Sequence, residues 1–239
     1  VSVINVHMLV ASNTGFWLGN YNLVDFFSAV GSNNIFFDPR VIYDPEQDRF
    51  IMALINGNYC STSQIVLAFS QTSDPRGNWN LYAIDGCPDQ NTTFADYPMI
   101  AITKNELFLT YNAVHSDSTW QAGFFGTHIH QIDKMSGYNG ETLNRRVWKN
   151  ISYQDKLIRN ICPVRNAGES LPESMYLLST RNFDITNDTV FLLQVTCTLD
   201  DPDTRLEIKP FKMNQPYGVP PYAVQPIDSL DTNDARVLD

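Results

Sequence analysis

The 239-residue chain is 43% hydrophobic and only 18% charged, a balance that can fill a folded core and excludes a mostly disordered protein. Sixteen basic and twenty-six acidic residues leave a formal charge of -10. That charge repels phosphate backbones and argues against nucleic acid as a partner. No run of the sequence approaches the roughly 18 uninterrupted apolar residues of a membrane-spanning helix, so we expect no direct membrane insertion.

Short runs rich in Val, Ile, Leu, Phe and Tyr recur along the chain between turn signals, which is the pattern of β-strands. Strand-like pieces cover residues 6–11, 15–18 and 23–27, and twelve further strands follow in three groups of four. The first group is 41–43, 50–56, 65–71 and 79–84; the second is 99–103, 107–112, 127–133 and 143–148; the third is 161–165, 175–180, 190–196 and 206–211. The only candidate helix lies around residues 153–159. The chain is therefore predicted to be all-β.

Each group opens with a short polar signature, and these openings repeat. They are Asp38-Pro39-Arg40, Asp96-Tyr97-Pro98, Asn160-Ile161-Cys162 and a fourth, Asp234-Ala235-Arg236, which begin 58, 64 and 74 residues apart. A period near sixty residues that carries four strands is typical of a β-propeller blade, whose apolar faces are buried only by stacking against neighbours.

We therefore predict a β-propeller region of four-stranded antiparallel blades that is an incomplete portion of a larger propeller. The expected parts are a partial blade over 1–30 made of the outer three strands, blades over about 36–86, 95–150 and 158–212, and the start of a further blade over 233–239. The remainder of a longer parent chain would supply the missing blades. The alternative is a closed four-bladed propeller in which residues 236–239 pair with the N-terminal strands.

Three segments carry recognisable motifs: FFDPRVIYDPEQDRFIMALI, IVLAFSQTSDPRGNWNLYAI and DYPMIAITKNELFLTYNAV. With them, and with GFFGTHIHQIDK, MYLLSTRNF and DTNDARVLD downstream, the chain resembles a family of bacterial secreted or surface β-propeller domains of sialidase-like architecture. The resemblance covers most of the chain and implies the fold and a place in large adhesive or repeat-containing surface proteins. It implies no catalytic motif. The cysteines and the loop over 166–173 depart from the family pattern.

Cysteines and glycosylation sequons favour an extracellular or cell-surface glycoprotein. The sequons begin at Asn91, Asn150 and Asn187. Cys60 follows a second strand and Cys87 the fourth strand of the same predicted blade, so both emerge on one face and a Cys60–Cys87 disulfide is expected. By elimination, Cys162 and Cys197 would form the second disulfide.

Because first strands line the channel of a propeller, the openings are predicted to form a ring at one channel mouth. The ring would contain Asp38, Arg40, Asp96, Asn160, Asp234 and Arg236. Facing carboxylates repel unless a cation or an arginine lies between them. We expect the two arginines to neutralise the ring without a cofactor; Ca²⁺ bound by Asp38, Asp96 and Asp234 is the alternative.

Other clusters are interpreted as structural. The turn from Asp74 to Trp79 is similar to a sialidase aspartate-box turn, with Asp74 capping backbone amides and Trp79 packing between blades. His128 and His130 lie on one face of a third strand, with a zinc or copper site as the alternative. Asp200, Asp201 and Asp203 form a solvated turn, with calcium binding as the alternative. The segment 216–222 is an interblade connector.

The predicted function is a non-enzymatic extracellular structural or binding module, acting in adhesion, in glycan or protein binding, or in self-assembly. The alternative is a glycoside hydrolase at the channel mouth. It would use Asp38 and Asp96 as its carboxylate pair, with Glu169 or Glu173 as the acid.

Overall fold

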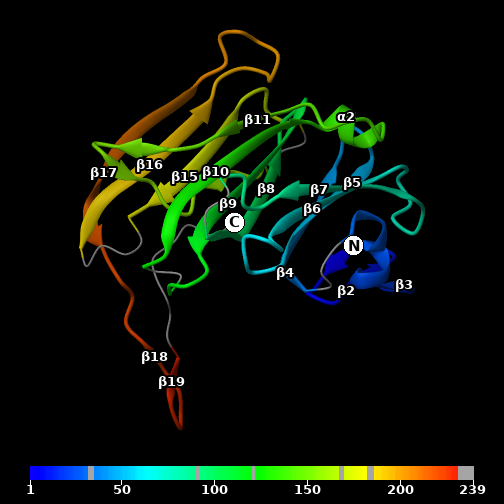
Figure 1. Ribbon diagram of the computed structural model, residues 1–239, viewed down its shortest axis with the longest axis horizontal. Coiled ribbons are helices and arrows are strands. Elements are labelled where there is room, and N and C mark those ends of the chain that lie inside the picture. The colour runs from blue at the N-terminus through cyan, green and yellow to red at the C-terminus, as the bar shows by residue number, and fades with distance from the viewer. Residues whose placement is uncertain (32–34, 90–91, 120–121, 167–169, 182–185, 231–239) are drawn as a thin grey trace.

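The computed structural model describes residues 1–31, 35–89, 92–119, 122–166, 170–181 and 186–230 (Figure 1). In this part of the chain the fold is all-β, and its main elements are four-stranded antiparallel sheets whose strands follow one another in chain order. Each of the twelve strands predicted in three groups is present with shifted bounds.

Three four-stranded sheets contain most of the strand residues in the described part of the chain. The first contains β4 (Phe36–Asp44), β5 (Arg49–Asn56), β6 (Gln64–Ser70) and β7 (Trp79–Asp85). The second contains β8 (Thr93–Ile102), β9 (Glu106–His115), β10 (Phe124–Asp133) and β11 (Arg145–Trp148). The third contains β14 (Cys162–Pro163), β15 (Met175–Thr180), β16 (Asn187–Val195) and β17 (Leu206–Tyr217). We call them sheets I, II and III.

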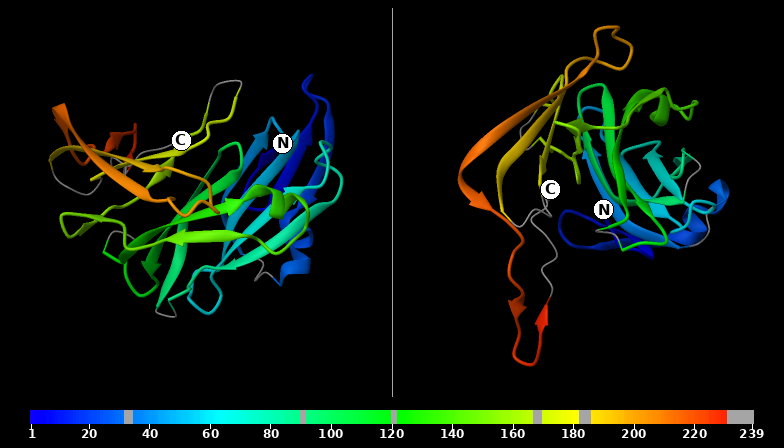
Figure 2. Two further views of the ribbon diagram at one scale, coloured as in Figure 1. Left: turned by 90° about the horizontal axis from the view of Figure 1, so that it is seen from above. Right: turned by 60° about the vertical axis from the view of Figure 1, so that its left-hand side comes forward.

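Smaller elements flank these sheets. A three-stranded sheet precedes them, with β1 (Ser2–Val3), β2 (His7–Ala11) and β3 (Trp17–Asn22), followed by α1 (Leu23–Phe26) and the 3₁₀ turn η1 (Ser28–Val30). Helix α2 (Lys134–Tyr138) follows β10. Two hairpins are formed by β12 (Ser152–Tyr153) with β13 (Lys156–Leu157), and by β18 (Ala223–Val224) with β19 (Ser229–Leu230). The second hairpin projects from the body (Figures 1 and 2).

The sheets are packed face to face in chain order, and three apolar clusters fill the joints. Strands β5 and β6 are buried along almost their whole length, because sheet I is covered on one face by the N-terminal sheet and on the other by sheet II. In β15, buried residues alternate with more exposed ones, because sheet III packs against sheet II through one face only among the described residues. First strands are neighbours: β1 contacts β4, β4 contacts β8 and β8 contacts β14.

Two expectations about local structure were wrong. Residues 23–27 form helix α1 rather than a strand, because the Asn22 side chain accepts the amide of Val24 and caps the helix start. In the N-terminal sheet, β1 lies beside β4, and η1 lies beside β7. The assignment of residues 1–30 to the outer three strands of a blade stays a prediction. The candidate helix around 153–159 contains the hairpin β12–β13, whose two turn residues Gln154 and Asp155 have φ of 51° and 59°, the signs that a type I′ turn requires.

The predicted Cys60–Cys87 disulfide is present, with Cα atoms 5.1 Å apart. The predicted Cys162–Cys197 disulfide was wrong, since the two residues are not bonded to each other. Cys162 is opposite Leu178, which is opposite Leu192, whereas Cys197 lies beyond the far end of β16. Cys162 is therefore level with the middle of β16, whereas Cys197 lies past one end of that strand.

A buried ion pair joins sheets I and II at the ends of their first strands. Lys134 Nζ lies 2.9 Å from Asp44 Oδ2, and the two side chains are 1% and 0% exposed. The same ammonium donates to the carbonyl of Thr103 at 3.1 Å, and the Tyr138 hydroxyl donates to Asp44 at 3.1 Å. Asp44 ends β4 of sheet I, whereas Lys134 and Tyr138 come from α2 and Thr103 follows β8 of sheet II, so this cluster holds the joint at its edge.

A Lys134→Ala substitution tests this cluster. Removing one partner leaves a buried charge without compensation, and we expect the free energy of unfolding in urea to fall by about 3–5 kcal/mol. Lys104→Ala is the matched control, because the Lys104–Glu173 pair is 52% and 70% exposed and such pairs contribute about 0–1 kcal/mol. Equal effects of the two substitutions would contradict the assignment.

Candidate functional site

The first strands of sheets I and II and the residue that leads into the first strand of sheet III share a local backbone feature. Asp38, Tyr97 and Asn160 have φ of 47°, 55° and 47°, a left-handed conformation that costs about 1–3 kcal/mol for residues other than glycine. The strand register shifts at this place in β4, between Phe37 and Arg40, and in β8, between Asp96 and Met99. The positions are 59 and 63 residues apart, so the repeat read from the openings has a structural counterpart.

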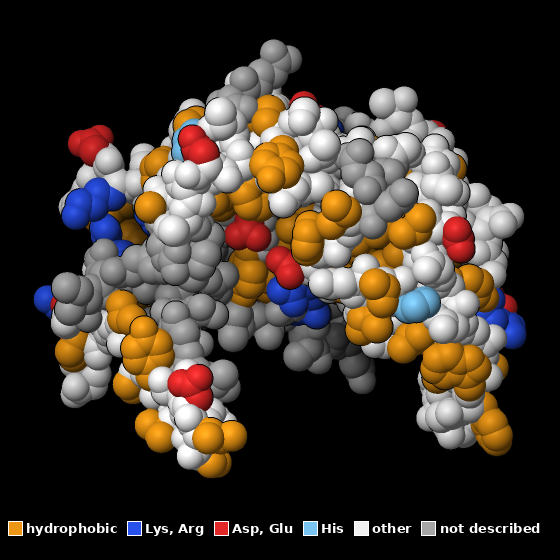
Figure 3. All heavy atoms as spheres, turned by 60° about the horizontal axis from the view of Figure 1, so that its bottom comes forward, with side chains coloured by type: hydrophobic (Ala, Val, Ile, Leu, Met, Phe, Trp, Pro, Cys, Tyr) orange, Lys and Arg blue, Asp and Glu red, His pale blue; other side chains and the backbone are white. Residues whose placement is uncertain are grey.

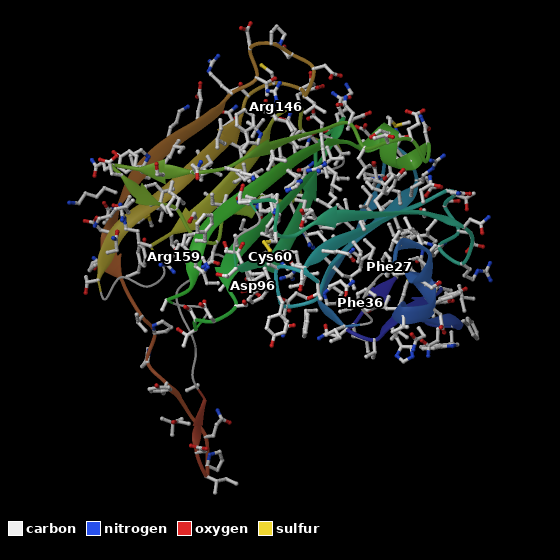
Figure 4. All side chains as sticks on the ribbon, viewed as in Figure 1. Phe27, Phe36, Cys60, Asp96, Arg146 and Arg159 are labelled. Atoms are coloured by element: carbon white, nitrogen blue, oxygen red, sulfur yellow. A yellow bond between two sulfur atoms is a disulfide. The ribbon has the colours of Figure 1, made fainter. Side chains whose placement is uncertain are left out.

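The bulge changes which residues of the openings correspond. Tyr97, not Asp96, occupies the position of Asp38, and Asp96 corresponds to Phe37. Asp38 and Asp96 are both half-buried, and Figure 4 shows Asp96 near the lower end of β8. Figure 3 brings the lower side of the Figure 1 view forward, and it shows acidic and basic side chains next to one another in a hollowed part of the surface.

Arg40 joins the first strands of sheets I and II. Its Nε donates to the carbonyl of Pro98 at 3.0 Å, and its guanidinium lies 5.8 Å from the centre of the Tyr97 ring. Asp234 and Arg236 lie outside the described residues, so the predicted ring, and a calcium ion within it, stay predictions.

Asn160 joins sheet III to sheet II in the interior. It is 7% exposed, its backbone amide donates to Asn112 Oδ1 at 3.2 Å, and its side-chain oxygen accepts from Asn112 Nδ2. The Thr127 hydroxyl also donates to Asn112 Oδ1, at 2.8 Å. Asn160 therefore lies in a buried polar contact between sheets, a role that the opening signature alone did not indicate.

A cleft of about 370 Å³ lies at the opposite ends of the same first strands. It lies at a place where three successive sheets meet. Its lining comprises Val41, Ile42, Tyr43 and Pro45 from sheet I, Ala101 and Ile102 from sheet II, and Arg165, Asn166 and Leu171 from the β14–β15 connection. We call it the three-sheet cleft.

Tyr43 forms one wall of the three-sheet cleft and is 48% exposed. Its hydroxyl donates to Asp48 Oδ1 at 2.6 Å, and its ring packs 5.3 Å from that of Phe50. The hydrogen bond to the Asp48 carboxylate raises the pKa of the phenol, because it favours the protonated form. The ring is therefore held in position although it is exposed.

The opposite wall is held by contacts to sheet II. Arg165 Nε donates to the carbonyl of Ile100 at 3.3 Å. Further along the loop, the Lys104 amide donates to the carbonyl of Pro172 at 3.0 Å, and Lys104 Nζ lies 3.1 Å from Glu173. The Glu173 carboxylate is thus an ion-pair partner at the edge of the cleft, and Glu169 lies outside the described residues.

His128 and His130 lie on one face of β10, as predicted, with both rings within 5.5 Å of the Tyr111 ring. His128 Nδ1 is 2.8 Å from the Tyr111 hydroxyl, and His130 Nδ1 accepts from Arg145 at 3.2 Å. Burial lowers the pKa of His128 to about 4 and that of His130 to about 3. Among the residues with described positions, no group of three metal-ligating side chains is assembled.

A second buried acid joins sheets II and III. Glu106 is 2% exposed and accepts the Leu199 amide at 2.6 Å and Gln131 Nε2 at 3.2 Å. Burial raises the pKa of this carboxyl despite these hydrogen bonds. A lone acid at the start of a strand is not distinctive in sequence, and neither Glu106 nor the three-sheet cleft is indicated by a motif.

Two turns behave as structural elements. Asp74 accepts the Arg76 amide at 3.0 Å, and Trp79 packs at the joint between sheet I and the N-terminal sheet, which confirms the interpretation of that segment. In the acidic turn, Asp201 accepts the Asp203 amide at 2.8 Å, and Asp200 accepts from Asn144 at 3.2 Å.

The sequons differ in setting. Asn150 is exposed, and Asn187 is half-buried with its side chain accepting the Thr189 amide at 2.7 Å. Asn91 lies outside the described residues.

Comparison with protein-family models, with curated proteins and with solved structures gives no match. Within the described ranges, no helix combines the length and apolar character needed to cross a membrane.

The buried histidines predict a pH dependence of stability. Because both folded-state pKa values lie below the ordinary value of about 6.5, the unfolded chain binds more protons below pH 6.5. The part of the free energy of unfolding that depends on the two histidines is fully present above pH 6.5. It is lost as the pH falls toward 4, by about 1.4 kcal/mol per pH unit for each histidine. We expect a His128→Asn, His130→Gln variant to lose less stability than the parent between pH 7 and pH 5 in urea titrations.

His7→Gln is the control for this comparison, since His7 lies on β2 of the N-terminal sheet, whereas Tyr111, His128 and His130 lie in sheet II. Parallel pH curves for the parent and the double variant would refute the role of the two histidines.

Proposed function

We propose that the chain is a section of a β-propeller that acts as a non-enzymatic binding module outside the cell. Support for the propeller comes from the order of the sheets. They follow the chain, their first strands are neighbours, and the left-handed bulge recurs at 59 and 63 residues. Four-stranded sheets that pack face to face in chain order are the arrangement expected of propeller blades.

Support for an extracellular location comes from covalent chemistry. Disulfides persist in oxidising compartments, and Cys60 and Cys87 are bonded. The exposed Asn150 begins a sequon, so a glycan can be attached there without burial.

The use made of the polar groups favours binding over catalysis. Arg40 and Asn160 connect sheets, and the two histidines of β10 have pKa values of about 4 and 3, far from the range in which an imidazole exchanges protons efficiently at neutral pH. Arg40 and Asn160 hold joints between sheets, and the two histidines make contacts within sheet II.

The observation that carries the proposal is the three-sheet cleft. Only the packed array of sheets creates it, because its walls come from sheet I, sheet II and the connection after β14. Ligand sites are concave and predominantly apolar with a few placed polar groups, which matches a lining of aliphatic residues with Tyr43, Arg165 and Asn166. A glycan or protein partner would contact this surface and the loops around it.

The competing hypothesis is a glycoside hydrolase that uses Asp38 and Asp96, and it predicts a different outcome. An Asp38→Asn, Asp96→Asn variant and the parent are compared on a glycan array and on chromogenic glycosides. A binding module binds without turnover, and the variant keeps that binding. Turnover by the parent that falls at least a thousandfold in the variant would replace our proposal with the enzyme.

In the same proposal, Arg40 rather than a calcium ion neutralises the carboxylates of the openings, Asp38 and Asp96. We expect the melting temperature to be unchanged by EDTA and by added Ca²⁺, and Arg40→Gln to lower it by several degrees, since an interblade hydrogen bond to a charged donor contributes about 1.5–3 kcal/mol. A fall in melting temperature with EDTA that Ca²⁺ reverses would support the metal instead.

A further inference from the structure

We propose that the three-sheet cleft binds an uncharged pyranose residue of a glycan, which stacks on the ring of Tyr43. This inference rests on the proposed binding function and names its ligand class. The cleft volume of about 370 Å³ falls within the range of about 300–1,000 Å³ that small-ligand pockets occupy, and is at the lower end, where single sugar residues fit.

Tyr43 has the properties of a stacking platform. Nearly half of its surface is exposed, yet the hydrogen bond to Asp48 and the contact with Phe50 fix the ring from two sides. Stacking on a ring that is already ordered costs little conformational entropy. The C–H face of a pyranose is apolar and the ring of Tyr43 offers a flat surface of similar size.

The floor of the cleft suits the same amphipathic ligand. Ile102 is 7% exposed and packs in the core between sheets I and II, while Ala101 is 1% exposed and packs toward sheet III. The end of β8 therefore closes the cleft with two largely buried aliphatic residues. This floor favours the carbon skeleton of the sugar, while hydroxyl groups at the rim of the pyranose need polar partners.

Polar partners come from the first-strand edge of sheet II and from the β14–β15 connection. The carbonyls of Pro98 and Ile100 point toward this edge, since Arg40 donates to the first and Arg165 to the second. Backbone groups alternate along a strand, so the carbonyl of Ile102 points the same way and lies in the cleft lining. On the facing wall, Asn166 Nδ2 donates to the carbonyl of Ser170, so this polar side chain is held in the cleft lining. The cleft therefore places backbone acceptors and a fixed polar side chain around the hydroxyls.

The charges around the cleft favour an uncharged sugar. Asp48 accepts from Tyr43 and Glu173 is paired with Lys104, while Arg165 is the cation in the lining. The whole chain has a formal charge of -10, which repels acidic glycans at long range. An acidic sugar would therefore gain one favourable contact, with Arg165, but would be repelled by the net negative charge of the chain.

The test measures binding of neutral sugars by saturation-transfer NMR and by calorimetry on the folded chain. The probes are galactose, glucose, mannose and N-acetylglucosamine with their short oligomers. The competing probes are glucuronic acid, sialic acid, a panel of unstructured peptides and a panel of extracellular proteins. We expect at least one neutral sugar to bind, and Tyr43→Ala to weaken that binding by about tenfold or more.

Matched variants separate stacking from folding. Tyr59→Ala removes a tyrosine of the β5–β6 connection that is 58% exposed and lies outside the cleft lining, and it should leave binding unchanged. Tyr43→Phe keeps the ring and should retain most of the affinity. The exposed Tyr43 side chain makes misfolding of the alanine variant improbable, and a thermal melt of each variant verifies that it is folded.

The outcomes distinguish this site from the wider proposal. If sugars or proteins bind but Tyr43→Ala has no effect, the three-sheet cleft is not the site, while the binding module stands. If acidic sugars or peptides bind through Tyr43 and neutral sugars do not, the assigned ligand class is wrong. If the chain binds none of the sugars, peptides or extracellular proteins offered, both proposals fail.

Discussion

Burial of apolar sheet faces against one another is the interaction on which this structure depends. Sheets I and II each have two apolar faces, and a core runs between them that includes Ile51, Leu67, Leu109 and Ile132. None of these side chains is exposed by more than a trace, because each sheet covers its neighbour. A single sheet of this kind would leave one or both faces in water, so the hydrophobic effect requires the array rather than the sheet.

Polar contacts determine how the faces align. Buried Asp44 with Lys134, and buried Glu106 with the Leu199 amide, hold the joints near one end of the sheets, while Arg40 and Asn160 hold them along the first strands. Buried polar groups are costly unless they are satisfied, so these contacts favour one alignment over shifted ones. The three-sheet cleft follows from that alignment, since a shift between sheets I and II would separate Tyr43 from Ile102.

The sequence predicted the strands well, because runs such as FIMALIN and IVLAFS combine β-branched and aromatic residues between clear turn signals. It also indicated the repeat. The aligned openings matched Asp96 with Asp38, whereas in the backbone Tyr97 is the residue that corresponds to Asp38. That difference of one residue arises from the bulge, which no periodicity reveals. The cleft and the clusters around Lys134 and Glu106 could not be predicted, because they combine residues from different sheets. The short helices α1 and α2 depend on capping by Asn22 and Asp133, which in sequence look like turn residues.

Native-state hydrogen exchange on a Leu109→Ala variant tests the packing of the sheets most directly. Leu109 lies on β9 of sheet II and is fully buried in the core shared with sheet I, and its truncation costs about 2–5 kcal/mol. The account predicts that amides of β5 and β6 in sheet I lose protection together with those of β9 and β10. Loss of protection confined to sheet II, with sheet I unchanged, would contradict it.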